Sequence, residues 1–409
     1  MTTSVKTKFD VGGVLLDRPF KVRRLGHFGF NSLKVEEARR FYVDLLGFRI
    51  SDEASFLKRF PEGTFEGMGP GGYFTRYGTD HHAFVIFNKR VMDKLTQMRG
   101  GTPRPGVTIN QITWQVGSLA EVGNAAKWFA EERVPVVRTG RDMPGSNWHT
   151  YVLDPDGHTN ELYYGIEQVG WEGFSKPLPM YQRGFQEAPP LPQINEFTEV
   201  QQALANDVDL HSGYRFEDSL PATYDVDGVL LPRPFKVVKI GPVGVYVRDM
   251  DAARAFYEGT LGFVLSEETT WKGLHCLFLR ANTEHHSLAL FPIELREALG
   301  ASPETTSACF GLQLANYRQL RDAVRFLKEQ GCRFVELPQE LHPGINYAAH
   351  VLDPDGHCIQ LYFYMEQIGW DGRPRPAANR PPVDPSAWPE TLEALPDVYG
   401  GEALMGPWA

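Results

Sequence analysis

Cysteine and long apolar runs are scarce in this sequence. The four cysteines, Cys276, Cys309, Cys332 and Cys358, all lie in the second half of the 409 residues and show no CxxC spacing, which argues against a disulfide framework or a thiolate zinc site. No run of about 18 apolar residues occurs, and the first residues, MTTSVKTKFDVGG, lack the apolar core of a signal peptide. We therefore expect a cytoplasmic protein that does not span a membrane.

Positively charged residues are also fewer than negatively charged ones, with 41 Lys and Arg against 51 Asp and Glu. The formal net charge is −10, which argues against nucleic acid or an anionic membrane as the main partner and favours a small neutral or aromatic ligand. The glycine-rich stretch GMGPGG at 67–72 has no following Lys-Ser/Thr and no helix start, so it does not predict a phosphate-binding loop.

What the sequence does contain is an extensive internal repeat. FDVGGVLLDRPFKV at 9–22 returns as YDVDGVLLPRPFKV at 224–237, and YVLDPDGHTNELYYGIEQVGW at 151–171 returns as HVLDPDGHCIQLYFYMEQIGW at 350–370. Because order and spacing are kept, the repeat indicates a tandem duplication of a unit of about 200 residues. We expect domains at 1–171 and 224–371, a linker at 172–223 and a proline-rich tail at 372–409.

Each half is expected to contain two βαβββ modules. In the first half, a strand at 23–32 leads into an amphipathic helix at 34–46, with Ala38, Phe41, Tyr42 and Leu45 on one face and Gly47 as its C-cap. Strand patterns follow near 48–53, 71–78 and 81–88, and the same order recurs between 108 and 165. The fold class is therefore α+β, with four modules in two tandem halves, each forming a curved mixed sheet around a cavity.

These modules carry motifs of a known family. The strings FYxxxLGF, the histidine pair at 81–82 and LDPDGHxxEL resemble the vicinal oxygen chelate superfamily, which includes glyoxalases, bleomycin-resistance proteins and extradiol dioxygenases. Within it, the sequence is most similar to the type I extradiol ring-cleavage dioxygenases. The resemblance covers roughly residues 20–170 and 235–370 and implies the fold more specifically than the reaction.

The resemblance also implies a metal site in the first half. The ligand positions of extradiol-like members fall on His27, Gln111 and Glu161. Histidine and carboxylate are the donors of non-haem Fe(II) sites, whereas the amide of Gln111 departs from that pattern and occurs in glyoxalase-like relatives. His149 shares a strand face with Tyr151 and is the alternative third ligand. Fe(II) is the expected metal, with Mn, Co, Ni and Zn left open.

The second half lacks the corresponding donors. Pro242 replaces His27, Gln360 replaces Glu161, and Gln111 aligns with Phe310 or Gly311 depending on one gap. We expect this half to be free of metal and to help enclose the cavity of the first.

Two further residues match the pocket chemistry of extradiol-like enzymes. His82 occupies the position of the acid–base group and Tyr151 that of the tyrosine that hydrogen-bonds the substrate hydroxyl, while His149 is a further candidate. A histidine with a near-neutral pKa can exchange protons during ring cleavage. His158 and His357 are expected to cap their DPDGH turns, and His81 to point away from His82.

Three functions remain at this point. The leading hypothesis is an Fe(II) dioxygenase that uses O₂ to cleave a catechol-like or vicinally oxygenated aromatic compound. The alternatives are a redox-neutral metalloenzyme of the same superfamily, acting as a lyase, isomerase or hydrolase, and a non-enzymatic small-molecule binding protein. No residue pattern decides whether the chain forms a homo-oligomer.

Overall fold

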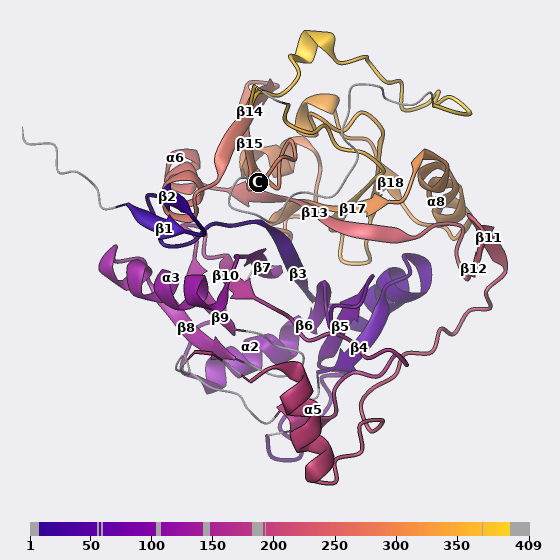
Figure 1. Ribbon diagram of the computed structural model, residues 1–409. Coiled ribbons are helices and arrows are strands. Elements are labelled where there is room, and N and C mark those ends of the chain that lie inside the picture. Colours follow the sequence, from indigo (N-terminus) through magenta and orange to yellow (C-terminus); the bar gives the residue numbers. More distant parts are fainter. Residues whose placement is uncertain are drawn as a thin grey trace, which may run out of the picture.

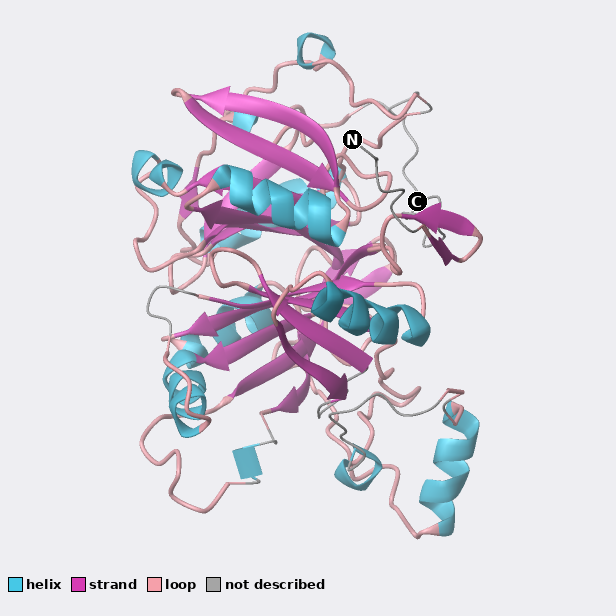
Figure 2. Ribbon diagram, turned by 90° about the vertical axis from the view of Figure 1, so that its left-hand side faces the viewer, coloured by secondary structure: helices cyan, strands magenta, loops and turns pink. Residues whose placement is uncertain are grey.

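The computed structural model describes residues 8–54, 57–58, 60–103, 108–141, 148–181, 191–192, 194–369 and 371–392. Figures 1 and 2 show the two halves one above the other, with the linker helix α5 (Glu196–Ala205) at the lower end. None of the described helices is long and apolar enough to cross a lipid bilayer.

Each half is built on one eight-stranded mixed sheet. The order is β4-β5-β6-β3-β7-β10-β9-β8 in the first half and β14-β15-β16-β13-β17-β20-β19-β18 in the second. The central strands of the first sheet, β3 and β7, are antiparallel, whereas β3–β6 and β7–β10 are parallel. The expected architecture of four βαβββ modules in two tandem halves is thereby confirmed.

The elements of the first half have these bounds: β1 Phe9–Val11, β2 Val14–Leu16, β3 Arg24–Ser32, α1 Val35–Arg39, η1 Arg40–Leu45, β4 Arg49–Glu53, β5 Gly72–Arg76, β6 Phe84–Asn88, α2 Lys89–Met98, β7 Ile109–Gln115, α3 Leu119–Glu131, β8 Val136–Arg141, β9 Trp148–Leu153 and β10 Thr159–Tyr164. The short helix α4 (Leu178–Tyr181) follows, before α5.

The second half repeats this order with β11 Tyr224–Val226, β12 Val229–Leu231, β13 Val237–Val247, α6 Met250–Arg254, η3 Ala255–Leu261, β14 Val264–Trp271, β15 Leu274–Arg280, β16 Leu288–Pro292, α7 Glu294–Ala298, β17 Ser307–Leu314, α8 Tyr317–Glu329, β18 Phe334–Val335, η4 Gln339–Leu341, β19 Ala348–Leu352 and β20 Cys358–Tyr362. The short helix η5 (Ala377–Asn379) lies in the tail.

The helix expected at 34–46 widens after its first turn. Residues 35–39 are α-helical, but 40–45 form a π-helix, in which Leu46 donates its backbone N–H to the carbonyl of Phe41 at 2.9 Å. Phe41, Tyr42 and Val43 are all buried, a run that the spacing of an α-helix alone does not predict. Gly47 ends the segment with a φ of +84°, as its assignment as a C-cap requires.

The two halves share one apolar core. The Phe310 ring of β17 stacks on Phe28 of β3 and on Phe84 of β6, with ring centroids 4.6 and 5.2 Å apart. Trp114 of β7 meets Phe263 of the second half edge to face at 4.7 Å. The sheets therefore do not form separate cores joined only by the linker.

The DPDGH turn of the second half docks onto the first. Tyr42 donates its hydroxyl to Asp353 Oδ2 at 2.9 Å, and the ring of His357 lies parallel to that of Phe30 with centroids 3.9 Å apart. Within the turn, His357 Nδ1 lies 2.9 Å from the same Asp353 oxygen. This turn, residues 353–357, is the second-half docking turn.

The corresponding turn of the first half makes the equivalent contact with the second half. Tyr257, the repeat of Tyr42, donates to Asp154 Oδ2 at 2.9 Å, and His158 Nδ1 lies 2.9 Å from that oxygen. Residues 154–158 are the first-half docking turn. Both turn histidines bond to their own turn, as their assignment as caps implies.

Candidate metal centre

Two of the metal-ligand candidates, His27 and Glu161, lie in one row across the sheet with Thr113 and Tyr151. His27 of β3 is opposite Thr113 of β7, Thr113 is opposite Glu161 of β10, and Glu161 is opposite Tyr151 of β9. Because opposite residues of paired strands project to the same side of a sheet, this register brings side chains from both modules of the first half together.

Glu161 is the centre of this cluster. One carboxylate oxygen, Oε2, lies 3.1 Å from His27 Nε2 and accepts a hydrogen bond from the Thr113 hydroxyl at 2.9 Å. The other, Oε1, lies 3.6 Å from His149 Nδ1. The side chain is 2% exposed, and no lysine or arginine in the described part of the chain forms an ion pair with it.

The carboxyl group of Glu161 is nevertheless ionised. Burial alone raises its pKa, but His27, His149 and the Thr113 hydroxyl outweigh burial and lower the pKa to about 2. A buried negative charge requires a compensating positive one. A divalent cation held by Glu161 and His27 meets that requirement, so the donor set fits a metal.

His27 is held close to two other rings. Its side chain is 1% exposed, and its ring lies 4.5 Å from that of His82 and 5.1 Å from that of Tyr163. Gly26 makes room for this packing, because a Cβ there would lie 2.1 Å from the Tyr163 ring. His27 Nδ1 is buried and has no hydrogen-bond partner among the described residues, so its Nε2, which faces Glu161, is the atom placed to bind a metal.

His82 lies beside the cluster rather than in it. Its Nδ1 is 3.2 Å from Nδ1 of His81, and both imidazoles are buried, whereas His81 was expected to point away. Burial first, and then the neighbouring His27 and His81, lower the pKa of His82 well below its ordinary value. His82 is therefore neutral at physiological pH, and its lowered pKa makes it a weaker base than the near-neutral histidine expected from the sequence.

The two candidates for the third ligand are placed differently. Gln111 lies opposite Gly29, two residues along β7 from Thr113, is partly exposed, and makes no hydrogen bond to His27 or Glu161 within the described part of the chain. His149 is 1% exposed, and its ring lies 4.6 Å from that of Tyr151. Of the two, His149 is the one in contact with the Glu161 carboxylate.

Thr113 was not singled out from the sequence. Its only signal is its position two residues after Gln111 on the same strand, which puts it on the same face. Its contact with Glu161 depends on the register between their two strands. The local sequence around Thr113 or Glu161 does not specify that register.

The equivalent positions in the second half carry no metal donors of this kind. Gln360 faces Gly311 as Glu161 faces Thr113, and Gly244 faces Cys309 as Gly29 faces Gln111. The alignment of Gln111 with Phe310 or Gly311 was therefore wrong, because the register places Cys309 there. Cys309 is buried, and burial raises its pKa to about 12, so it is a neutral thiol.

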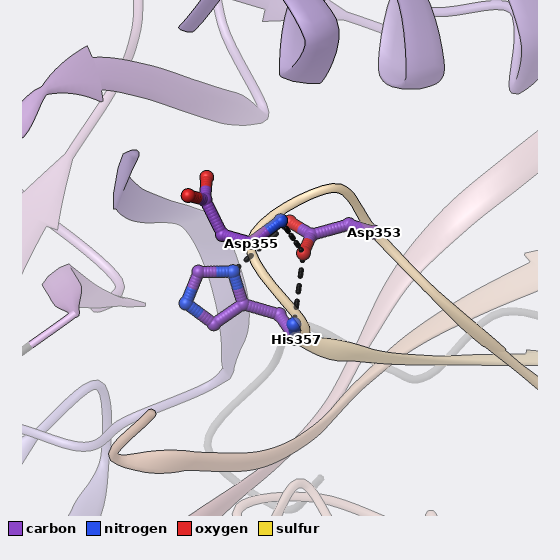
Figure 3. A group of neighbouring side chains, drawn as sticks. All are labelled: Asp353, Asp355 and His357. Carbon is purple, nitrogen blue, oxygen red and sulfur yellow. Dashed lines mark hydrogen bonds and ion pairs between the residues drawn. The ribbon is translucent and has the colours of Figure 1, made fainter. Parts of the chain in front are cut away.

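Asp353, Asp355 and His357 are the one group of acidic and histidine side chains in the described residues whose donor atoms all lie within 4.8 Å (Figure 3). Their oxygens already have partners. Asp353 Oδ1 accepts the backbone N–H groups of Asp355 and His357, and Ser32 donates its hydroxyl to Asp355. This cluster is the second-half docking turn, and its geometry is explained without a metal.

Comparison with known proteins identifies the family. The model of the Glyoxalase/Bleomycin resistance protein/Dioxygenase superfamily matches residues 24–162 and 239–361, which is more than half of the chain. The chain belongs to this superfamily. Both matched segments coincide with the paired modules, and the resemblance inferred from the sequence motifs is confirmed.

Two curated members of the superfamily are similar in sequence. Metapyrocatechase 2 of Cupriavidus necator is 29% identical over 148 residues, which cover 36% of this chain and 38% of that protein. A 2,2',3-trihydroxybiphenyl dioxygenase of Sphingomonas paucimobilis is 25% identical over 209 residues, which cover 51% and 64%. The chain thus spans less than two thirds of the length of either relative.

Solved structures of the superfamily share the fold. The homoprotocatechuate 2,3-dioxygenase of Arthrobacter globiformis matches with a TM-score of 0.52 and 18% identity, covering 85% of this chain and 82% of that one. The Mn(II)-bound glyoxalase of Novosphingobium aromaticivorans matches with a TM-score of 0.53 and 14% identity, covering 86% and 85%. At these identities the likeness describes architecture and leaves the reaction to the site.

Proposed function

We propose that this chain is an Fe(II)-dependent extradiol-type dioxygenase that cleaves a catechol-like aromatic ring with O₂. The observation that carries the proposal is the buried, ionised Glu161 carboxylate, which faces His27 and has no lysine or arginine ion-pair partner among the described residues. The names of the two curated relatives, a metapyrocatechase and a trihydroxybiphenyl dioxygenase, support the choice of an aromatic diol.

In this proposal, His27 and Glu161 hold the metal and His149 is the third donor. A bound Fe(II) supplies open coordination positions for the two vicinal oxygens of the substrate and for O₂. Thr113 fixes the orientation of the Glu161 carboxylate through its hydrogen bond. Such hydrogen bonds to a ligand typically change metal affinity by 10- to 100-fold when removed.

The remaining residues act on the substrate. His82 is buried beside His27, and its proposed role is to exchange a proton with a substrate hydroxyl, which requires that substrate binding raise its lowered pKa. Tyr151 lies opposite Glu161 and stacks against the Arg138 guanidinium at 4.6 Å, where its hydroxyl is proposed to hydrogen-bond a substrate oxygen. The partly exposed Gln111 is left as a polar contact for substrate or water.

A redox-neutral metalloenzyme is the second candidate. Gln111 favours it, because this residue occupies the family position of a histidine ligand and an amide oxygen is a weaker donor than imidazole. In such an enzyme, the metal, which could be Mn, Co, Ni or Zn, acts as a Lewis acid and consumes no O₂. A cytoplasmic location and the presence or absence of self-association stay predictions.

Metal analysis followed by oxygen-electrode assays tests the proposal. Protein purified without oxygen is expected to hold close to one iron per chain, and Glu161→Ala and His27→Ala to lose it. His286→Ala is the matched control, because His286 is an equally buried histidine at the repeat position of His82, and it should keep the iron. With a panel of catechols, only the iron-containing proteins should consume O₂.

The same measurement distinguishes the third ligand. We expect His149→Ala to lose iron and Gln111→Ala to keep most of it. The reverse result would assign the ligand to Gln111. Another divalent metal without O₂ uptake would support the redox-neutral enzyme, and iron retained in both Glu161→Ala and His27→Ala would refute this metal site.

A further inference from the structure

The second half contains a cavity of about 510 Å³, which is within the size range of small-molecule sites. It lies at the β18 edge of the second sheet, between α8, strands β18 and β19 and the C-terminal segment. Figure 1 shows this segment, in yellow, running over the second half towards α8. Nothing in the proposed dioxygenase activity uses this cavity.

Most of the wall is apolar. Aliphatic and aromatic side chains line it from three directions, namely Val324 of α8, Phe334 and Val335 of β18, and Val383, Pro385 and Trp388 of the C-terminal segment. Apolar walls with a few convergent polar groups are typical of sites for small organic ligands.

The C-terminal segment is fastened where it covers the cavity. Tyr317 of α8 donates its hydroxyl to the Pro389 carbonyl at 2.6 Å, and Trp388 packs against Tyr347 with ring centroids 5.7 Å apart. Further back, Arg380 forms ion pairs with Glu267 at 2.7 Å and Glu366 at 3.1 Å. The wall formed by Val383, Pro385 and Trp388 is therefore held between two anchored points.

One polar group inside the cavity has hydrogen-bonding capacity to spare. His350 is 3% exposed and lines the cavity, and its Nε2 accepts a hydrogen bond from the Gln360 amide at 3.1 Å. Its ring proton is therefore on Nδ1, and Nδ1 makes no hydrogen bond with any described residue. Nδ1 is therefore a donor that no described residue uses, and a ligand oxygen in the cavity would accept from it.

The charge state of the cavity selects against charged ligands. Burial, and then His342, lower the pKa of His350 well below its ordinary value, so the imidazole is neutral. The charged lining residues, Lys328 and Glu336, are both exposed and opposite in sign. An anion buried beside a neutral imidazole would lose its hydration without a compensating cation.

We propose that this cavity is a second, metal-independent binding site that takes an uncharged planar aromatic compound bearing a hydrogen-bond-accepting oxygen, such as an aryl ketone. The oxygen accepts from His350 Nδ1, and the rings lie along the apolar wall beside Val335 and Ala348, which project to the same side of the sheet as His350. The proposal does not depend on the dioxygenase activity, because no residue of the cavity belongs to the first half.

Equilibrium binding of three probes to EDTA-treated full-length protein tests the proposal. 2-Acetylnaphthalene supplies the rings and the oxygen, 2-ethylnaphthalene has nearly the same shape without the oxygen, and 2-naphthoate adds a charge. We expect 2-acetylnaphthalene to bind at least ten-fold more tightly than either of the others. Equal affinities for 2-acetylnaphthalene and 2-ethylnaphthalene would refute the role of His350.

Variants of the protein test whether 2-acetylnaphthalene binds in this cavity. Ala348→Trp fills the cavity on the His350 side of β19 at a half-buried position and should weaken 2-acetylnaphthalene binding at least ten-fold, whereas Ala205→Trp, on the exposed face of α5, is the control and should not. His350→Phe should abolish the preference for the ketone, provided its thermal unfolding matches that of wild type. If it unfolds, the Ala348→Trp variant and the probe comparison still decide.

The Glu161→Ala variant distinguishes this proposal from the proposed dioxygenase function. Loss of iron with retention of 2-acetylnaphthalene binding is the expected result. Binding that disappears in Glu161→Ala and survives in Ala348→Trp would place the ligand in the first half, and the absence of binding to EDTA-treated wild type would overturn the proposal.

Discussion

Two histidines with nearly the same surroundings have different expected roles. His82 and His286 are both buried, each bonds through Nδ1 to the preceding histidine, and each lies 5.1 Å from a phenylalanine ring, Phe74 or Phe278. Only His82 has His27 beside it. The local environment of the pair is thus structural, and a role in proton transfer depends on the neighbouring metal donors.

Replacing each histidine separately tests this distinction. We expect His82→Ala to reduce turnover of a catechol substrate by about 10²–10⁴-fold, the usual contribution of general acid–base catalysis, with iron content unchanged. His286→Ala should reduce turnover only as far as it reduces the folded fraction. Parallel losses in the two variants would show that His82 contributes to folding and not to chemistry.

At the scale of elements, the docking turns make the stability of the protein depend on pH. Burial raises the pKa of Asp353, but His357 and the Tyr42 hydroxyl outweigh burial and lower it. A lowered pKa in the folded state stabilises the protein above the unfolded-state value, and this contribution disappears as the pH falls through the folded-state pKa. The hydrogen bond from Tyr42 is therefore strongest when Asp353 is ionised.

Removing that hydroxyl should be costly at neutral pH. We expect Tyr42→Phe and Tyr257→Phe each to lower the free energy of unfolding by about 1–3 kcal/mol, because each leaves a buried carboxylate short of a donor. For Tyr42→Phe, the difference from wild type should shrink only as the pH falls below the ordinary aspartate value of 3.8 and through the lowered folded-state pKa of Asp353. Urea unfolding from pH 7 down to pH 2 measures both effects.

Tyr224→Phe is the control for these variants, since Tyr224 is 38% exposed and should change stability little. A deficit in Tyr42→Phe that stays constant from pH 7 down to pH 2 would mean that the Asp353 charge does not contribute to the contact.

Most elements could be predicted from the sequence, and the exceptions have physical causes. The strands at 24–32 and 159–164 follow buried apolar patterns next to turn residues, which are local signals. Helix α2 was missed, although Asn88 caps its first turn by accepting from the N–H groups of Arg90 and Val91. The π-helix was also missed, because the spacing of its apolar residues predicted an ordinary α-helix.

The residues of the candidate site could be predicted from the sequence, but their arrangement in space could not. His27, Glu161 and His149 could be proposed from motifs and strand alternation, and the structure brings all three together. The place of Thr113 in the cluster and the pairing of Gly244 with Cys309 depend on inter-strand register. Register is set by long-range pairing, which a single sequence does not show.

At the scale of the whole molecule, the shared core predicts that the halves unfold together. Phe310 of the second half stacks on two rings of the first, so Phe310→Ala leaves a cavity at the junction. We expect a loss of about 3–5 kcal/mol and a single unfolding transition, followed by circular dichroism and tryptophan fluorescence. Phe197→Ala is the control, because Phe197 is 74% exposed.

Separate transitions in the two signals would contradict this prediction. They would show that each half is stable without the aromatic stack between them.

The docking turns also bear on how such a chain can evolve. Tyr42 meets the turn of the second half as Tyr257 meets the turn of the first, so the contact is the self-complementary surface that two identical subunits form about a two-fold axis. Two unfused copies of an ancestral half would present this surface to each other. Once the copies were joined, selection could preserve the mutual contact while releasing the metal donors of one copy. Pro242 and Gln360, which stand at the positions of His27 and Glu161, take no part in the docking-turn contacts.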